Sequence, residues 1–178
     1  MINIRKGIFE TNSSSTHSLC IQTKAVEKIP NYVYFNVNDF GWEVEKHYNY
    51  WHSVSPSYLY TALLNVYKED SPELNDWLNY IKTTLEKYDC QVDFEQNPYK
   101  EYSNGYKFCV SHIDHANELI PLLNELRNNE DKLIRFLFGE DTFILTGNDN
   151  GEEFEILWEH YHNEEGFDDK YEVFEKGN

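Results

Sequence analysis

The chain has 178 residues, 40% of them hydrophobic and 16% aromatic, and its 32 acidic against 15 basic residues give a formal net charge of −17. That length can bury one core but is short for two, so we expect a single domain over residues 1–178. So acidic a surface repels phosphate backbones, which argues against direct nucleic-acid binding and favours basic protein surfaces or cations as partners. The alternative is that the acidic surface only keeps the chain in solution.

Cysteine usage and hydropathy indicate the compartment. Cys20, Cys90 and Cys109 are an odd number of cysteines without close spacing, so we expect no disulfide. No charged-then-apolar signal segment opens the sequence, and no apolar run approaches the roughly 18 residues of a membrane span. We therefore expect a soluble cytoplasmic protein that makes no contact with a membrane.

The first third of the chain alternates apolar and polar residues in the way typical of strands. Strands are predicted at residues 1–9 and 18–23. Residues 31–37 and 42–45 are expected to pair as a hairpin across a turn. Residues 46–57 are aromatic but irregular, and a loop is expected there.

Two helices follow. Apolar residues recur at helical spacing over residues 59–67 and again over residues 74–88. Ser71 and Pro72 lie between these segments and supply an N-cap and a first-turn proline for the second helix. The two segments are therefore expected to form an αα-hairpin.

The rest of the chain mixes strand and helix patterns. Short apolar runs bounded by turn residues predict strands at residues 91–95, 106–111, 142–146, 153–158 and 171–174. A polar loop is expected at 97–105, and the strands at 142–146 and 153–158 are expected to pair as a hairpin. Helices are predicted around residues 119–126, where Pro121 fits only in the first turn, and at 130–138, which Gly139 ends. This order predicts an α+β fold, with a mainly antiparallel sheet packed by about four helices.

One polar stretch concentrates functional groups. It reads Glu10-Thr11-Asn12-Ser13-Ser14-Ser15-Thr16-His17-Ser18. Serine, histidine and glutamate are the groups of nucleophilic catalysis, so the catalytic candidates are Glu10, Ser14, Ser15 and His17. On a strand, Ser15 and His17 would point to one face, and Thr16 and Ser18 to the other.

Two other roles fit the same stretch. Hydroxyls and turn amides can hold a phosphate or carboxylate without breaking a bond, which makes ligand-binding candidates of Asn12, Ser13, Ser14, Ser15 and His17. A purely structural turn is the other role, because short polar side chains bond to local backbone groups. Neither a Gly-x-Ser-x-Gly elbow nor a glycine-rich phosphate loop is present to favour catalysis.

The stretch also carries a resemblance. Phe9 to Ser18, preceded by Arg5-Lys6-Gly7, resembles the N-terminal signature of a loose group of small, uncharacterised proteins from bacteriophages and other bacterial mobile elements. The resemblance covers roughly the first 20 residues. It implies a bacterial or phage protein in the host cytoplasm, and it implies no particular activity.

Histidines raise the question of a metal. His112, Asp114 and His115 lie close to Cys109 in the sequence, and His160 and His162 form a second group. These are zinc-ligand residue types. Neither a Cys-x-x-Cys nor a His-Glu-x-x-His pattern accompanies them, so we expect surface or partly buried histidines, no metal and no cofactor.

Acidic residues stand two positions apart on three predicted strands. The pairs, which are the partner-binding candidates, are Glu43 with Glu45, Asp93 with Glu95, and Glu153 with Glu155. Strand alternation turns both carboxylates of a pair to one face, about 6.8 Å apart. Strands that share one sheet would then form an anionic plate. The alternative is that any half-exposed strand turns its polar residues outward.

These patterns lead to two main hypotheses. The favoured one is a small acidic phage-type protein that binds and modulates or inhibits a basic host protein, such as a nucleic-acid-binding defence or transcription factor. The other is an enzyme or ligand-binding protein for a nucleotide or phosphate ester at residues 10–18. A soluble domain with a purely structural motif is a further alternative, and the oligomeric state is left open.

Overall fold

The structure is a computed structural model of the chain that describes residues 15–40, 45–49, 52–101, 103, 105, 107–148 and 170–176. Its helices are α1 (Val54–Val66), α2 (Pro72–Glu86), α3 (Ile120–Asn128) and α4 (Glu130–Phe138), and a 3-10 turn, η2 (Ala116–Leu119), precedes α3. Its strands are β1 (Ser15–Gln22), β2 (Tyr32–Phe35), β3 (Glu45–Tyr48), β4 (Gln91–Phe94), β5 (Tyr99–Glu101), β6 (Lys107–Cys109), β7 (Phe143–Asn148) and β8 (Tyr171–Lys176). Predicted strands at residues 1–9 and 153–158 lie outside the described residues.

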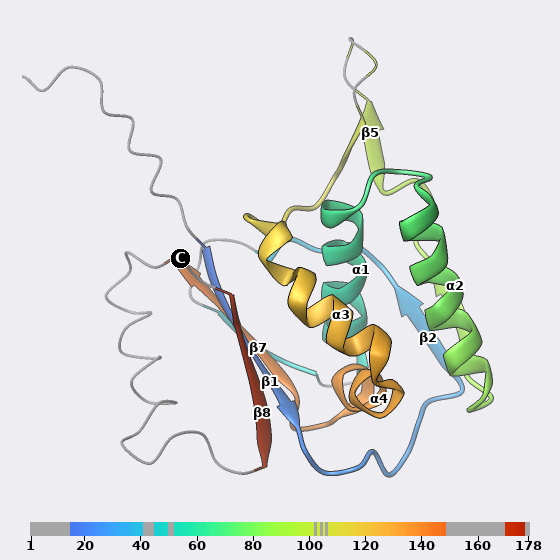
Figure 1. Ribbon diagram of the computed structural model, residues 1–178, viewed down its shortest axis with the longest axis vertical. Coiled ribbons are helices and arrows are strands. Elements are labelled where there is room, and N and C mark those ends of the chain that lie inside the picture. The colour runs from blue at the N-terminus through green and yellow to red at the C-terminus, as the bar shows by residue number, and fades with distance from the viewer. Residues whose placement is uncertain are drawn as a thin grey trace, which may run out of the picture.

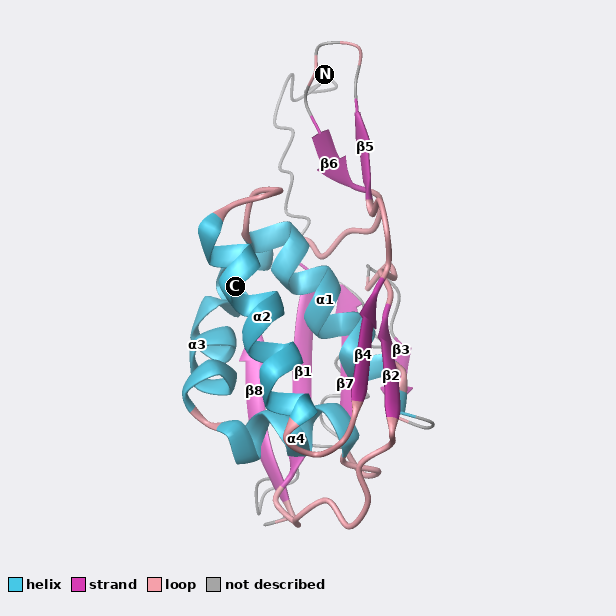
Figure 2. Ribbon diagram, turned by 90° about the vertical axis from the view of Figure 1, so that its right-hand side faces the viewer, coloured by secondary structure: helices cyan, strands magenta, loops and turns pink. Residues whose placement is uncertain are grey.

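A four-stranded antiparallel sheet has the order β3-β7-β1-β8. β1 pairs with a strand on each of its edges. Ser15 lies opposite Asn148 on β7, and Gln22 lies opposite Tyr171 on β8. The four helices lie on one face of this sheet, and β7, β1 and β8 run side by side behind them (Figures 1 and 2). β1, which contains the end of the polar motif, is therefore central to the sheet.

The other two sheets have two strands each. β5 and β6 are antiparallel and project from one end of the body (Figure 2). β2 and β4 run parallel, with Tyr32 opposite Gln91 and Phe35 opposite Phe94. Parallel strands need a crossover connection, and the segment between β2 and β4 contains α1 and α2. The mixed architecture is consistent with the expected α+β class, but the parallel pair was not predicted, and an αα-hairpin of α1 and α2 stays a prediction.

The predicted hairpin of residues 31–37 with 42–45 is wrong for the residues that the structure describes. β2 pairs with β4 instead of with its neighbour in sequence, and β3 pairs with β7; residues 42–44 lie outside the described part of the chain. β7 pairs with β1 on one edge and with β3 on the other, and the predicted hairpin of residues 142–146 with 153–158 lies partly outside the described residues and stays a prediction. Long-range pairing outweighed the local turn signal in the first hairpin, because β3 joins a four-stranded sheet and the β2–β4 pair packs against α1 and α2, whereas an isolated hairpin is only marginally stable.

Two predicted loops contain regular structure. Residues 46–57 include most of β3 and the first turn of α1, and β5 lies within the predicted polar loop at 97–105. Aromatic and histidine side chains obscured the pattern in the first loop, because they fit a half-buried strand as well as an irregular segment. Residues 97–105 are too polar to show a strand pattern, and the side chains of β5 are mostly exposed.

The helices of the second half agree with the sequence. α4 covers Glu130–Phe138 as predicted, with Asn129 capping it by accepting a hydrogen bond from the Lys132 backbone N–H at 3.0 Å. Pro121 lies in the first turn of α3, where its missing N–H leaves no helix hydrogen bond unmade. Ser71 caps α2 by accepting from the backbone N–H of Leu74 at 3.2 Å. None of the helices in the described ranges is long and apolar enough to cross a membrane.

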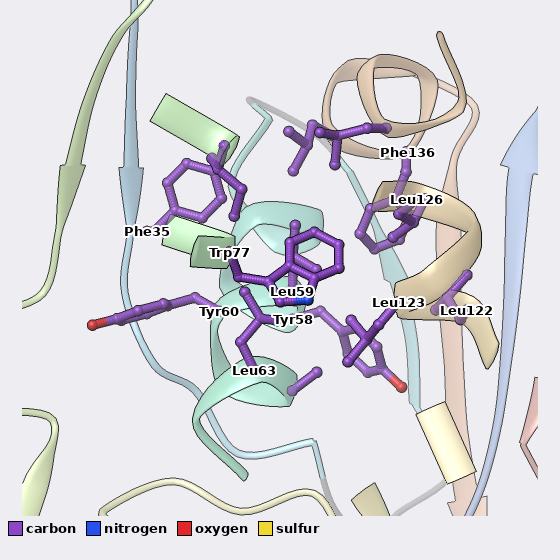
Figure 3. Packing of buried hydrophobic residues seen from close by; sticks show 14 of the residues in the cluster. Phe35, Tyr58, Leu59, Tyr60, Leu63, Trp77, Leu122, Leu123, Leu126 and Phe136 are labelled. Carbon is purple, nitrogen blue, oxygen red and sulfur yellow. The ribbon is translucent and has the colours of Figure 1, made fainter. Parts of the chain in front are cut away.

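The core is centred on α1, which is buried around most of its circumference. Tyr58, Leu59 and Leu63 of α1 belong to the same buried cluster as Trp77 of α2 and Phe136 of α4 (Figure 3). The four-stranded sheet contributes Leu19, Ile21 and Ile144, and β2 contributes Val33 and Phe35. Because α1 packs against elements on several sides, it joins the four-stranded sheet to the β2–β4 pair.

A tight turn connects α4 to β7. The Thr142 hydroxyl donates to the Arg135 carbonyl at 3.0 Å and accepts from the Gln22 backbone N–H at 3.2 Å. The Gln22 side-chain oxygen accepts from the Asp141 N–H at 3.1 Å. A Cβ at Gly139 would lie 2.5 Å from both the Arg135 carbonyl oxygen and Thr142 Oγ1, so the turn requires glycine.

We expect Gly139→Ala to lower the free energy of unfolding by about 2–3 kcal/mol, because the added methyl group would clash with the Arg135 carbonyl oxygen and with the hydrogen-bonded side chains of Thr142 and Gln22. Urea denaturation measures the loss. Glu140→Ala, at the next and exposed position, is the control and should change the free energy by less than about 0.5 kcal/mol. Equal losses in the two variants would contradict the steric account of Gly139.

Candidate functional sites

The polar motif ends inside β1. Ser15, Thr16, His17 and Ser18 are its first four residues. Residues 10–14 lie outside the described part of the chain, so the structure does not place the candidates Glu10, Asn12, Ser13 and Ser14, nor the side chain of Ser15. Among the motif candidates, only the His17 side chain can be examined.

His17 belongs to a polar row across the four-stranded sheet. Glu45 on β3 is opposite Thr146 on β7, Thr146 is opposite His17, and His17 is opposite Lys176 on β8. Directly paired residues point to the same face of a sheet, so these four share one face. It is the face toward the helices, because Nδ1 of His17 lies 2.8 Å from the hydroxyl of Tyr58 on α1.

The centre of this row is shielded from water. His17 is 0% exposed, and Tyr58 and Lys176 are each 1% exposed. Burial, together with the charges of Lys176 and His47, lowers the pKa of His17 to about 3, so the imidazole is neutral at pH 7. Burial also raises the pKa of Tyr58 above its ordinary value.

Two opposing effects act on the pKa of Lys176. Burial lowers the pKa of its ammonium group, and the charges of Glu118 and Asp114 oppose that shift. Nε2 of His17 has no hydrogen-bond partner among the described residues. The arrangement is a buried imidazole that is hydrogen-bonded to a phenol of α1 and has an ammonium-bearing residue opposite it on β8.

Such burial bears on the catalytic hypothesis. A general base must come within hydrogen-bond reach of the proton that it takes. His17 exposes no surface to a substrate in this structure, and Ser18, on the opposite face, is only 1% exposed. The described half of the motif therefore has the geometry of a structural element.

The acidic-pair residues that the structure describes do not all lie in one sheet. Glu45 lies on β3 in the four-stranded sheet, whereas Asp93 lies on β4 in the two-stranded sheet. Glu95 is half-buried, and its carboxylate accepts a hydrogen bond from the Val37 N–H at 2.8 Å. The condition of one shared sheet is therefore not met by Glu45 and Asp93. Glu43, Glu153 and Glu155 lie outside the described residues.

The described histidines do not form a metal centre. His112 Nε2 is 3.9 Å from Asp114 Oδ1, and His115 Nδ1 is 3.3 Å from Glu118 Oε1. No group of three or more His, Cys, Asp or Glu side chains in the described ranges is arranged to hold a metal ion. His160 and His162 lie outside those ranges.

Two exposed tyrosines were not recognised as site residues from the sequence. Tyr32 and Tyr34 on β2 are 48% and 45% exposed, although Val33 and Phe35 of the same strand are buried in the core. The parallel register places Tyr34 opposite the exposed Asp93, and Tyr32 opposite the exposed Gln91. We call Tyr32, Tyr34, Gln91 and Asp93 the tyrosine face.

Asp93 acts directly on the neighbouring phenol. Desolvation of the Tyr32 hydroxyl, followed by the charge and a hydrogen bond of Asp93, raises the pKa of Tyr32. Strand alternation in the sequence was enough to put the two tyrosines on one face, but the carboxylate beside them depends on the pairing of residues 59 positions apart, such as Tyr34 with Asp93. The chain matches no protein-family model, no curated protein and no solved structure in the three comparisons.

We expect His17→Ala to lower the free energy of unfolding by about 2–4 kcal/mol, because it leaves a cavity and removes the hydrogen-bond partner of the buried Tyr58 hydroxyl. Urea denaturation is the measurement. Thr16→Ala, at the adjacent half-buried position of β1, should cost about 1 kcal/mol or less. A His17→Ala variant as stable as the control would contradict a structural role.

The depressed pKa of His17 also predicts a pH dependence. The unfolded chain takes up a proton near the ordinary pKa of 6.5, whereas folded His17 does so only near 3, so its contribution to stability is complete above pH 6.5 and is lost as the pH falls. Between pH 7 and 5.5 this loss should be about 1 kcal/mol.

His17→Gln is expected to lose correspondingly less stability than the wild type over the same pH interval. Urea denaturation at pH 7 and 5.5 measures both proteins. His112→Gln, at an exposed histidine, is the control and should retain the wild-type pH dependence. Identical pH dependence in the wild type and His17→Gln would show that His17 titrates normally in the folded protein.

Proposed function

We propose that this is a small acidic phage-type protein of the host cytoplasm that binds and modulates or inhibits a basic host protein, and that the tyrosine face makes the contact. The observation that supports it is the exposure of Tyr32 and Tyr34 beside Asp93. The N-terminal resemblance to phage proteins agrees with such a role.

Tyrosine is well suited to an interface. Its side chain has a large rigid ring and a hydroxyl group, so it gains contact area at a low cost in conformational entropy. Two such rings about half exposed on one strand offer a contact surface. The buried Val33 and Phe35 hold the strand from behind, so the rings are presented on a rigid element.

The charge of the face and of the whole protein selects the partner. Lysine and arginine bind over tyrosine rings by cation–π attraction, and Asp93 can form an ion pair with the same cation. The net charge of −17 steers a basic protein toward the surface and repels free nucleic acid. Nucleic-acid-binding host proteins carry the basic patches that match this description.

The alternative function, binding of a nucleotide or phosphate ester at residues 10–18, has weaker support. His17, the one candidate residue whose side chain is described, is buried, and burial keeps the ring neutral at pH 7. A neutral buried imidazole is a poor receptor for a phosphate, which needs positive charge or several exposed N–H donors.

We expect a labelled deca-arginine peptide to bind the protein, and Tyr32→Ser with Tyr34→Ser to weaken that binding at least tenfold, which is about 1.4 kcal/mol. Fluorescence anisotropy at low salt is the measurement. Asp93→Asn should reduce the steepness with which added salt weakens the complex, because one ion pair is lost.

The control variant for the same experiment is Tyr88→Ser combined with Asp76→Asn. Tyr88 is 41% exposed and Asp76 is exposed on α2, so this variant removes one ring and one charge from another part of the surface. Its binding should equal that of the wild type. Equal weakening in test and control variants would contradict the tyrosine face, and no binding at low salt would contradict a basic partner.

A further inference from the structure

The tyrosine face lies on a strand with one edge that the described residues leave unpaired. β2 and β4 lie side by side as a sheet of two strands (Figure 2). The Phe35 carbonyl accepts a hydrogen bond from the Glu95 N–H at 2.8 Å, so the backbone groups of Phe35 face β4. Successive residues of a strand turn these groups to opposite edges. Those of Tyr32 and Tyr34 therefore point away from β4, toward the unpaired edge.

This edge lacks the charged residues that protect the edges of the other strands. An unpaired edge is a template for a further strand, and proteins usually block it with charged side chains, proline or a bulge. β3, β4, β5, β6 and β8 each contain a lysine, an aspartate or a glutamate. β1 and β7 contain none, but both of their edges are paired. β2 reads Tyr-Val-Tyr-Phe, so in the described part of the chain it alone combines an unpaired edge with an uncharged sequence.

The length of β2 limits what its backbone can contribute to binding. The strand has four residues, so an added strand would gain few main-chain hydrogen bonds. In complexes formed by strand addition, the main chain supplies affinity and the side chains supply specificity. Specific binding at so short an edge therefore needs side-chain contacts, and the two tyrosines of the same strand can provide them.

A strand added at this edge would place its side chains beside the tyrosine rings. Neighbouring strands lie about 4.8 Å apart, and side chains on one face of a strand recur about every 6.8 Å. Tyr32 and Tyr34 have the same spacing, so alternate residues of the added strand would align with the two rings. Asp93 lies on the other side of Tyr34, on β4. A long arginine side chain can therefore lie across the ring and approach the carboxylate.

The two faces of β2 define the sequence of the added strand. Its outer face carries tyrosines beside a carboxylate on a protein of net charge −17, which favours lysine or arginine. Its inner face, with Val33 and Phe35, belongs to the core, which disfavours charge. Basic and uncharged residues should therefore alternate in the segment that binds.

We propose that an extended segment of the partner, with arginine or lysine at alternate positions, adds to β2 as a third strand of the β2–β4 sheet. Its main chain bonds to the backbone of Tyr32 and Tyr34, and its basic side chains lie over the tyrosine face. This inference rests on the proposed function, because it states how the face is bound. The proposed function itself requires only that a basic protein contacts the face.

Amide hydrogen exchange of the full chain, measured by NMR with and without saturating acetyl-(Arg-Thr)5-amide, tests the pairing. We expect the backbone amides of Tyr32 and Tyr34 to exchange at least tenfold more slowly in the complex, because they gain hydrogen-bond partners. Val92 and Phe94 are the matched control, because their backbone groups point to the opposite edge of the sheet. Unchanged exchange at the two tyrosines, or slowing at Val92 and Phe94 instead, would overturn the proposal.

Two N-methylated forms of the labelled peptide separate strand pairing from simple charge attraction. One form is methylated at the arginine amides and the other at the threonine amides, so their charge and composition are equal. A strand turns alternate amides to each edge, so in fluorescence anisotropy one form should bind at least tenfold more weakly than the other.

The same titrations distinguish failure of this inference from failure of the proposed function. Equal affinities of the two methylated forms would overturn strand addition. If Tyr32→Ser with Tyr34→Ser still weakened binding of the unmethylated peptide, the proposed function would stand without it. An unmethylated peptide that bound this double variant as tightly as the wild type would contradict the proposed function, and strand addition with it.

Discussion

The pairing of β1 on both of its edges is the constraint on which the rest of the structure depends. Its ladders to β7 and β8 bring residues 15–22 against two segments from the last 36 residues of the chain. Gln22, at the end of β1, bonds to the α4–β7 turn, and its carbonyl accepts from the buried Arg135 at 2.8 Å. Arg135 also pairs with Glu172 of β8 at 2.7 Å, so the charge is compensated where it is buried.

The opposite ends of β1 serve different purposes. His17, near the start, points beneath α1 and contacts Tyr58, where burial keeps it neutral. Gln22, near the other end, supports the α4–β7 turn that requires Gly139. The two residues are five positions apart, about 17 Å along the strand, so the buried histidine and the supported turn lie well apart on one strand.

α1 separates the residues that are buried from those that stay exposed. It packs against both the four-stranded sheet and β2, so the helix-facing side of each sheet becomes core. Tyr32 and Tyr34 lie on the other side of β2 and stay exposed, while Val33 and Phe35 anchor the strand. The same packing that withdraws His17 from solvent therefore leaves the tyrosine face exposed.

Local signals in the sequence determined the helices: the caps Ser71 and Asn129 and the stop at Gly139 act on neighbouring residues, which is why the bounds of α4 could be predicted. Alternation likewise determined that Tyr32 and Tyr34 share a face. Tertiary structure alone decided the strand pairing, because the partners of β2 and β3 lie far along the chain and a strand's pattern does not name its partner. It also decided that His17 is buried, because burial is a property of packed elements and not of residue order.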